Sequence, residues 1–396
     1  MREAVIVAYG RTPVCKARKG SFAGVNPLEW GTQALLGTLD KVPQLDVKEI
    51  DDLVVGTATP ANELGGNVAR LLINRAGLPE SIPGQTINRF CSSSLQAVAT
   101  CACAILAGQA QVMVAGGIEY MSSEGPPQSM EYANPWLMEH YPGAYMPMGI
   151  TAENVVRRYG ITREEMDRMA VESNRKAWAA QQSGGLNQAI IPITISTPEG
   201  ERVVTLDEGI RPDTSLEICA GLKTAFLPPE EGGTVTAATS SQTSDGASFV
   251  VLMSGEKAAA LGVTPIARFI SFAAAGCPAE IMGVGPIYAV PKALELAGLT
   301  MDQMDVIELN EAFASQALVC IRTLGMPEEK VNPWGGAMAL GHPMGATGGF
   351  LLSKALDYLR LNGGRYALVT MCVGGGMGAA GVFELLDTPR QGGNTQ

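Results

Sequence analysis

Cysteine and histidine are the side chains most able to do chemistry in this 396-residue sequence, and some of them adjoin glycine- or serine-rich turns. Cys91 follows Asn-Arg-Phe and precedes three serines, at an expected junction between a strand and a helix. A thiol there faces the positive end of the helix dipole and unpaired backbone N–H groups, both of which stabilise a thiolate. Cys91 is therefore a candidate nucleophile, although a free cysteine is also commonly a small buried hydrophobic residue.

Histidine occurs only twice, so base chemistry that needs an imidazole has few possible positions. His342 lies in Gly-His-Pro-Met-Gly-Ala-Thr-Gly, where glycines let the backbone approach a ligand and proline stiffens the loop. By itself such a histidine is as compatible with a structural role as with a catalytic one. His140 lies among Tyr, Met and Pro residues without these surroundings, and we expect it to be structural.

Two further groups follow expected strands in the last part of the chain. Cys372 precedes a valine and the glycine run that begins at Gly374, a pattern that lets backbone amides approach a substrate oxygen. A tight turn between two strands is the alternative. Asn310 begins Asn-Glu-Ala-Phe and offers an amide beside a carboxylate, although alone it resembles a helix N-cap with an acidic first turn.

The elements that must position these groups occur twice in the sequence. In each part, a strand, a helix and a second extended segment lead through a loop into another helix and a buried strand. The first set comprises strands at 52–56, ending near 87–88 and at 112–115, with a helix at 66–75. The second set comprises strands at 305–309 and 366–371, a helix at 311–324, an extended pair at 331–332 and a helix that starts at 345–348.

An insertion separates the last strand of the first half, 245–252, from the strands before it. We expect an N-terminal half at 1–117 completed by 245–268, an inserted domain at 118–244 and a C-terminal half at 269–396. Alternating strands and helices favour a layered α/β architecture with buried sheets. Pseudo-twofold packing of the halves would bring Cys91 and His342 face to face, as in a Cys/His catalytic site.

Composition excludes several other classes of protein. With 28 basic and 39 acidic residues the net charge is −11, which disfavours nucleic acid as a partner. Two histidines are too few for a histidine-rich metal site, and the eight cysteines show no C-x-x-C pair and are too sparse for a disulfide framework, which favours the cytoplasm. The uncharged stretch 95–118 is long enough to span a membrane. Its polar breaks instead predict a helix to about Ala107, a turn and a strand, and no membrane span.

Four motifs together resemble the signatures of the thiolase family over essentially the whole chain. They are Asn-Arg-x-Cys-Ser-Ser around Cys91, Asn-Glu-Ala-Phe at 310–313, Gly-His-Pro at 341–343 and Cys-x-Gly-Gly-Gly-Met-Gly at 372–378. The resemblance implies an α/β, thiolase-like fold, with two repeated β-α-β-α-β-α-β-β halves in an α/β/α/β/α core and residues 118–244 as a CoA-binding loop domain. It also implies a homodimer or homotetramer, with residues 121–147 contributing to the larger assembly.

The resemblance further implies roles for the candidate residues. Cys91 would attack the 3-keto carbon of a 3-ketoacyl-CoA, and His342 would activate that thiol. His342 and a water held by Asn310 would stabilise the thioester oxygen of the departing acetyl-CoA enolate. Cys372 would protonate the enolate and later deprotonate the incoming CoA. The backbone N–H groups of Cys91 and Gly374 would form a second oxyanion hole.

By the same resemblance, CoA is a substrate, and no metal or tightly bound cofactor is expected. Residues matching the family's CoA contacts and acyl pocket are Arg211, Ala237, Ser241, Thr243, Ala312 and Phe313, with Met148 and Met282. Two positions depart from the family pattern. Pro147 replaces a histidine common in biosynthetic relatives, and Ser94 stands where glycine is usual.

The residues within the motifs resemble those of degradative 3-ketoacyl-CoA thiolases more closely, and a biosynthetic acetoacetyl-CoA thiolase is the alternative. A ketoacyl-synthase-like condensing enzyme would favour a second catalytic histidine where Cys372 stands. An inactive CoA-binding homologue is disfavoured because all four reactive side chains are retained. An NAD-binding dehydrogenase is disfavoured because no G-x-G-x-x-G follows a first strand. Two thiols in one site also suggest that oxidation could couple Cys91 to Cys372.

Overall fold

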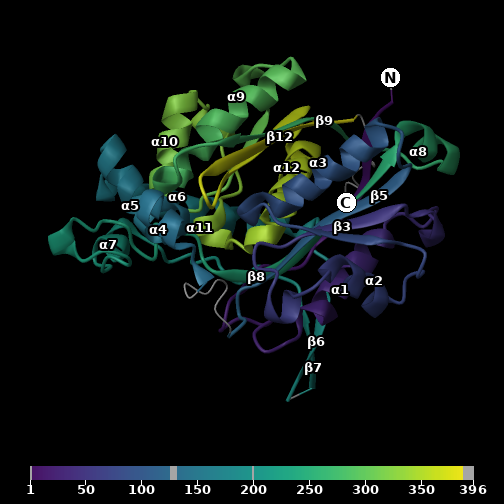
Figure 1. The fold of residues 1–396 in the computed structure, drawn as a ribbon, viewed down its shortest axis with the longest axis horizontal. Coiled ribbons are helices and arrows are strands. Elements are labelled where there is room, and N and C mark those ends of the chain that lie inside the picture. Colours follow the sequence, from purple (N-terminus) through teal and green to yellow (C-terminus); the bar gives the residue numbers. More distant parts are fainter. Residues whose placement is uncertain (1, 125–131, 199, 387–396) are drawn as a thin grey trace, which may run out of the picture.

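The computed structural model describes residues 2–124, 132–198 and 200–386. Its central feature is a ten-stranded sheet with the order β4-β3-β5-β8-β1-β9-β12-β11-β10, in which the short β2 also pairs with β8 (Figure 1). The strands from β4 to β1 form the N-terminal half: β4 (Gly84–Ile87), β3 (Asp52–Gly56), β5 (Val112–Tyr120), β8 (Ser244–Ser254), β1 (Ala4–Arg11) and β2 (Cys15–Lys16). Those of the C-terminal half are β9 (Ala267–Gly276), β12 (Met377–Leu385), β11 (Tyr366–Val373) and β10 (Val306–Leu309).

The two halves repeat the same pairing pattern on either side of the β1–β9 contact. Antiparallel pairs β1–β8 and β8–β5 in one half correspond to β9–β12 and β12–β11 in the other. The parallel pair β3–β5 corresponds to β10–β11. At the far edge, β4 lies parallel to β3, and a single parallel bridge from Ile307 to Val331 takes the equivalent place. The repeat expected from the sequence is therefore confirmed, except that the counterpart of β4 is one bridge long.

Helices separate and cover the two parts of the sheet in five layers. Helices α3 (Ser93–Leu106) and α12 (Thr347–Asn362) form the central layer and share one apolar core with strands of both halves. A second core lies under α1 (Pro27–Leu39) and α2 (Val68–Ala76), and a third under α9 (Gly285–Ala297) and α10 (Ala314–Leu324). The two central helices cross closely, because a Cβ added at Gly348 would lie 2.5 Å from the Leu95 nitrogen.

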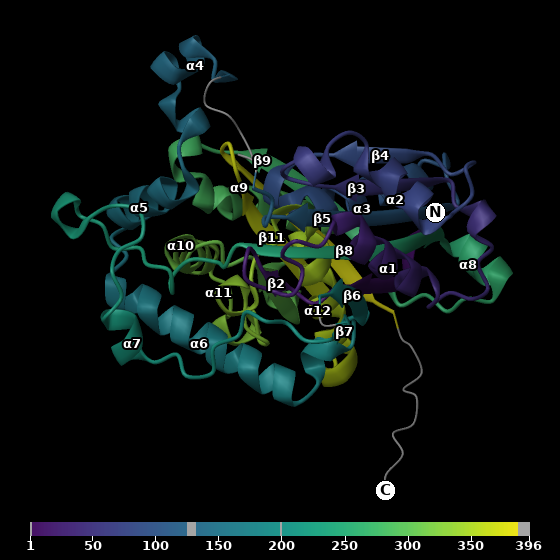
Figure 2. The same cartoon turned by 90° about the horizontal axis from the view of Figure 1, so that it is seen from below.

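Most of the insertion lies at one end of the sheet, as Figures 1 and 2 both show. Its elements are α4 (Pro135–His140), α5 (Met148–Tyr159), α6 (Arg163–Gln182), α7 (Leu216–Ala220) and the hairpin β6 (Ile193–Thr197) with β7 (Gly200–Val204). A capping box starts α6, with Thr162 and Glu165 bonding each other's backbone. The α-helices of the described residues that remain to be named are α8 (Gly255–Leu261) and α11 (Ala337–Leu340). Residues 125–131, part of the segment expected to support a larger assembly, lie outside the described residues.

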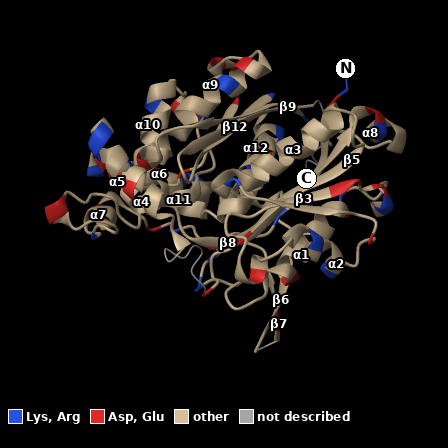
Figure 3. Cartoon of the chain, in the orientation of Figure 1, with Lys and Arg blue, Asp and Glu red and all other residues tan. Residues whose placement is uncertain are grey.

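The uncharged stretch at 95–118 divides as expected, since α3 ends at Leu106, Gly108 turns with φ +75° and β5 begins at Val112. Within the described parts of the chain, no helix has the length and apolar character needed to cross a membrane. The helix expected at 311–324 starts three residues later, because the backbone at Phe313 is extended and forms a bridge with Ser240. Charged residues gather on peripheral helices such as α5, α8 and α9, while the strands between them are largely uncharged (Figure 3).

Candidate active site

Cys91 lies in a single 3₁₀ turn, Phe90–Ser92, between the edge strand β4 and the central helix α3. The turn is tight, with φ +43° at Phe90. Side chains on both sides hold its backbone: Asn88 Oδ1 accepts the Phe90 N–H at 2.7 Å, and Ser93 Oγ accepts the Arg89 N–H at 2.9 Å. The nucleophile candidate is thus fixed by backbone geometry at the start of a buried helix, and its own side chain is 8% exposed.

Burial raises the pKa of the Cys91 thiol to about 11. A hydrogen bond from the Gly374 N–H to the sulfur acts in the opposite direction, the negative charge of Glu119 raises the pKa, and the Cys91 N–H lowers it. The backbone donors expected from the sequence are present, but desolvation outweighs their stabilisation of the thiolate. Cys91 is a thiol at neutral pH and needs a base. The two backbone N–H groups that contact its sulfur are those predicted to form an oxyanion hole.

His342 is a neutral imidazole, because burial lowers its pKa to about 4. Its Nδ1 lies 2.6 Å from Thr347 Oγ1, and its Nε2 lies 3.3 Å from Asn310 Nδ2. Since the amide nitrogen donates, Nε2 is the acceptor and Nδ1 carries the ring proton. The Nδ1–H donates a hydrogen bond to the threonine hydroxyl. The His342 N–H is also bonded to the carbonyl of Gln242 at 2.9 Å. The ring is therefore held in the tautomer that leaves Nε2 free to accept a proton.

The remaining reactive side chains converge on this point. The 3₁₀ turn Met344–Ala346, which follows His342, packs against the turn that holds Cys91. Cys372 is fully buried, and burial followed by the nearby Cys91 raises its pKa well above the ordinary value. Both cysteines are free thiols, and their oxidative coupling remains a prediction. A neutral base, two thiols and two aimed N–H groups can exchange protons and hold a developing negative charge.

Glu119, near the end of β5, was not identified from the sequence, although its carboxylate holds the backbone around the site. Its buried carboxylate accepts the N–H of Gly345 at 2.7 Å, of Ala58 at 2.8 Å and of Thr59 at 3.1 Å. It thereby ties the loop after His342 to the loop after β3. A lone acidic residue inside an otherwise apolar strand is the signal that could have identified it, since an unpaired buried carboxylate is costly. Thr347 was also missed, because threonine at a helix start has many ordinary roles.

Ser241 and Thr243, two of the residues predicted to contact CoA, lie on one segment of the insertion beside Ala312 and His342. The Ser241 N–H bonds the carbonyl of Ala312 at 2.9 Å, and Thr243 forms a bridge with His342. Phe313 and Ala312 share a buried apolar cluster with Met282 and Cys372. On the other side, a Cβ at Gly374 would lie 3.7 Å from the Met148 sulfur and 3.6 Å from the Phe90 ring.

Two other predicted CoA contacts lie farther out. Ala237 and Arg211 are exposed, and Arg211 forms no salt bridge with a described residue. Arg211 lies two residues after Gly209, whose carbonyl accepts a hydrogen bond from the Gln242 side chain at 2.9 Å. The backbone near Arg211 therefore lies beside the segment that contacts His342.

One of the two departures from the family pattern has a clear structural role. Ser94 Oγ accepts the Gly349 N–H at 3.0 Å, so the serine on α3 satisfies a backbone donor in the first turn of α12. Pro147 directly precedes α5 and makes no side-chain cap. Nothing in its surroundings explains why this residue is proline.

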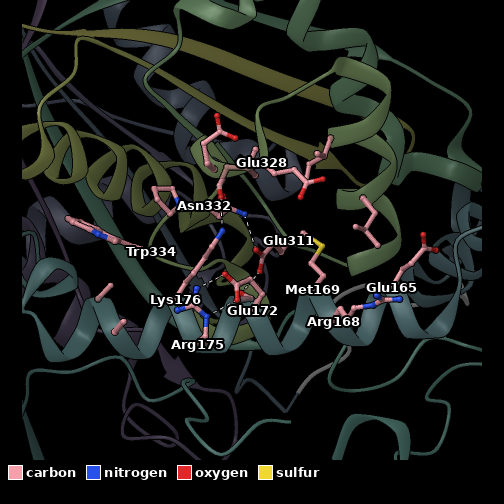
Figure 4. A pocket seen from close by; sticks show the side chains of 18 of the residues that line it. Glu165, Arg168, Met169, Glu172, Arg175, Lys176, Glu311, Glu328, Asn332 and Trp334 are labelled. Atoms are coloured by element: carbon pink, nitrogen blue, oxygen red, sulfur yellow. Dashed lines mark hydrogen bonds and ion pairs between the residues drawn. The ribbon is translucent and has the colours of Figure 1, made fainter. Parts of the chain in front are cut away.

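A cavity of about 1140 Å³ lies elsewhere, between α6 and the region of α10 and residues 328–334 (Figure 4). None of the four predicted catalytic side chains lines it. Glu311 reaches its floor, where Ser173 donates a 2.6 Å hydrogen bond and Asn332 a 2.9 Å hydrogen bond to the carboxylate. Among the described residues, no group of three His, Cys, Asp or Glu side chains could hold a metal ion.

Fold and site together define an α/β protein of two similar halves with a cysteine and a histidine in adjoining turns, and comparison with known proteins identifies the family. The model of the thiolase N-terminal domain matches residues 4–256 and that of the thiolase C-terminal domain matches residues 263–385. The chain therefore belongs to the thiolase family.

Similar proteins cover nearly all of the chain. It is 47% identical to the 3-ketoacyl-CoA thiolase of Bacillus subtilis, over 97% of this chain and 100% of the relative. Peroxisomal 3-ketoacyl-CoA thiolase B of Rattus norvegicus is 43% identical, over 96% of this chain and 90% of its own. The crystal structure of Bacillus anthracis acetyl-CoA acetyltransferase superposes with a TM-score of 0.90 at 36% identity, over 98% of this chain and 99% of that chain. The dimeric peroxisomal thiolase of Saccharomyces cerevisiae gives the same TM-score and identity, over 97% of each chain.

Proposed function

We propose that this protein cleaves 3-ketoacyl-CoA with CoA, giving acetyl-CoA and an acyl-CoA shortened by two carbons. The observation that carries this proposal is the convergence of Cys91, Cys372 and a neutral His342 whose Nε2 faces Asn310. The high identity to 3-ketoacyl-CoA thiolases over almost the whole chain supports the degradative reaction.

In the first half-reaction, His342 Nε2 takes the Cys91 proton and the sulfur attacks the keto carbon. The bond between the α and keto carbons then breaks, leaving the acyl group on Cys91 and an acetyl-CoA enolate. His342 and Asn310 stabilise the enolate oxygen, and Cys372 gives its proton to the enolate carbon. The buried, uncharged resting state of both thiols suits this sequence, because each proton is held until it is needed.

In the second half-reaction, the Cys372 thiolate takes the proton of the incoming CoA thiol. The CoA sulfur attacks the acyl thioester, and the resulting oxyanion accepts hydrogen bonds from the N–H groups of Cys91 and Gly374. Collapse releases acyl-CoA, and the Cys91 sulfur recovers its proton from the imidazolium of His342. Both cysteines and the histidine return to their starting states.

CoA binding is proposed along Ser241 and Thr243, with Ala312 and Phe313 opposite them. The exposed Arg211 and Ala237 would contact the outer part of the nucleotide, since a guanidinium is suited to phosphate. Met148 and Met282 would line the acyl pocket, because Met148 lies beside Gly374 and Met282 shares a cluster with Cys372.

We further propose a homodimer or homotetramer in a reducing cytoplasm. At the sheet edge, β4 pairs only with β3 among the described strands, and the similar yeast thiolase is dimeric. The eight cysteines are free thiols, which fits a reducing compartment. CoA enters as a substrate, and the proposed reaction needs no tightly bound cofactor.

The direct test is CoA-dependent loss of the enolate absorbance of acetoacetyl-CoA and of longer 3-ketoacyl-CoA esters. Cys91→Ala is expected to lower kcat by roughly 10³-fold or more, because no other side chain replaces the nucleophile. The matched control is Cys103→Ala, since Cys103 is exposed and lies on α3, the helix that follows Cys91. Full activity of a folded Cys91→Ala variant would refute the assignment, and activity confined to acetoacetyl-CoA would favour the biosynthetic alternative.

A further inference from the structure

A buried ion pair connects β10, the strand before Asn310, to α12, the helix that follows the His342 loop. Lys354 Nζ lies 2.9 Å from Glu308 Oε2, and the two side chains are 6% and 0% exposed. The lysine also donates to the carbonyl of Gly335. The Glu308 carboxylate has no hydrogen-bond partner apart from this ammonium among the described residues. Replacing such a pair by apolar side chains is often neutral or stabilising, so stability alone is a weak reason for its presence.

The pair connects the two elements that carry Asn310 and the support of His342. Glu308 lies on β10, and Asn310 directly follows this strand and continues its pairing through the bond from the Asn310 N–H to the Thr370 carbonyl. The alternation of side chains therefore places Glu308 and Asn310 on the same face. Lys354 lies on α12 two turns after Thr347, whose hydroxyl holds His342 Nδ1. The ion pair thus joins the strand that presents the amide to the helix that orients the imidazole.

Among the described residues, the Asn310 side chain has one hydrogen-bonding contact. Its Nδ2 has the 3.3 Å contact with His342, while its buried Oδ1 has no hydrogen-bond partner among the described residues. A cavity of about 30 Å³ reaches Asn310, Thr347 and Lys354, so close packing does not fill the space between them. Backbone bonds from Asn310 N–H to Thr370 and from Gln316 to the Asn310 carbonyl fix only the main chain.

We propose that the Glu308–Lys354 ion pair positions the Asn310 amide against His342 Nε2. Glu308 and Lys354 are then positioning residues for the contact that stabilises the enolate. The inference rests on the proposed thiolase reaction. A displacement of about 1 Å in such a contact is enough to cost roughly 10²-fold in rate.

The main test is the double variant Glu308→Met/Lys354→Met, which removes both charges at similar side-chain length. Its Tm is expected to stay within a few degrees of wild type, its KM for CoA is unchanged, and its kcat falls about tenfold or more. Wild-type kcat in this folded variant overturns the proposal. If the double variant does not fold, Glu308→Gln decides, because it keeps the size and an acceptor for Lys354. Unchanged kcat in folded Glu308→Gln also overturns the proposal.

Two further measurements separate positioning from a general loss of structure. In an Asn310→Ala background, the Met/Met substitutions are expected to change kcat less than about twofold, because the pair acts through the missing amide. A further tenfold loss there refutes that route. The matched control is Arg268→Met, which breaks an ion pair to the buried Glu384 far from the site. It is expected to lower Tm with kcat within about twofold, and an equal loss of kcat refutes a specific effect.

These outcomes are distinct from failure of the proposed reaction. If Cys91→Ala retains activity, the thiolase mechanism itself fails. If Cys91→Ala is inactive and the Met/Met variant has wild-type kcat, only the positioning role fails.

Discussion

The two halves of the molecule share one sheet pattern but hold their reactive groups by different means. In the N-terminal half, a short turn of residues 88–92 connects β4 to α3 and presents Cys91. In the C-terminal half, a much longer loop from Val331 to Thr347 takes the same place and carries His342. Both connections contain a strained non-glycine residue, Phe90 and Asn332, each with φ +43°.

The difference teaches how one repeat came to supply a nucleophile and the other its proton partners. Among the described residues, the thiol in the short turn has no side-chain hydrogen-bond partner, and the backbone N–H groups of Cys91 and Gly374 contact it. The long loop instead reaches the insertion and α12, where Gln242 and Thr347 bind the backbone and ring of His342. Backbone geometry therefore controls the nucleophile, and side-chain contacts control the base. Four predictions test this contrast.

The largest effect is expected from removing the second thiol of the C-terminal half. Cys372→Ala should lower the cleavage rate by about 10²- to 10⁴-fold, since both the enolate and the incoming CoA lose their proton partner. Steady-state kinetics with acetoacetyl-CoA measure it. Cys320→Ala is the matched control, because Cys320 is also fully buried in this half. Equal losses in the two variants would mean that burial, and not proton transfer, is what Cys372 supplies.

A smaller effect is expected from Thr347, which orients the imidazole. Thr347→Val keeps the shape but leaves the buried Nδ1–H without an acceptor, so kcat should fall roughly ten- to hundredfold, part of the value of a general base. Thr347→Ser should restore most of the rate because the hydroxyl returns. A valine variant with wild-type kcat would show that the loop backbone suffices to hold His342.

The ionisation of Cys91 tests the N-terminal half. With its pKa raised to about 11 by burial, the thiolate fraction should grow about tenfold per pH unit below that value. Iodoacetamide labelling of the Cys91 peptide, followed by mass spectrometry between about pH 6 and 9, should rise accordingly. Labelling of the exposed Cys103 in the same digest reports reagent access. A plateau below about pH 8 would show that the backbone donors outweigh burial after all.

The smallest effect concerns the contact between the central helices. Ser94→Ala removes the acceptor for the Gly349 N–H and should lower the free energy of unfolding by about 1 kcal/mol. The rate should remain within about twofold, because neither residue is assigned to the reaction. Denaturant unfolding gives the first quantity. A large loss of kcat without a loss of stability would move Ser94 into the catalytic machinery.

The sequence was sufficient for the repeat and the insertion, because motif order and strand–helix alternation carry that information. The packing of the turn that holds Cys91 against the turn after His342 agrees with the expected symmetry of the halves. The raised pKa of Cys91 could not be predicted from its motif, since the burial that raises it depends on residues far away in the chain. Glu119 and Lys354 were missed for a related reason. Their roles depend on partners at positions 345 and 308, which no local pattern connects to them.

The close crossing of α3 and α12 at Gly348 also affects how the protein folds. Cys91, before α3, and His342, before α12, lie far apart in the sequence, so forming this crossing closes a long loop of chain. Loop closure over such a separation is late and slow in comparison with local helix formation. Enzymatic activity should therefore return only with the last refolding phase, after most of the helical signal has recovered.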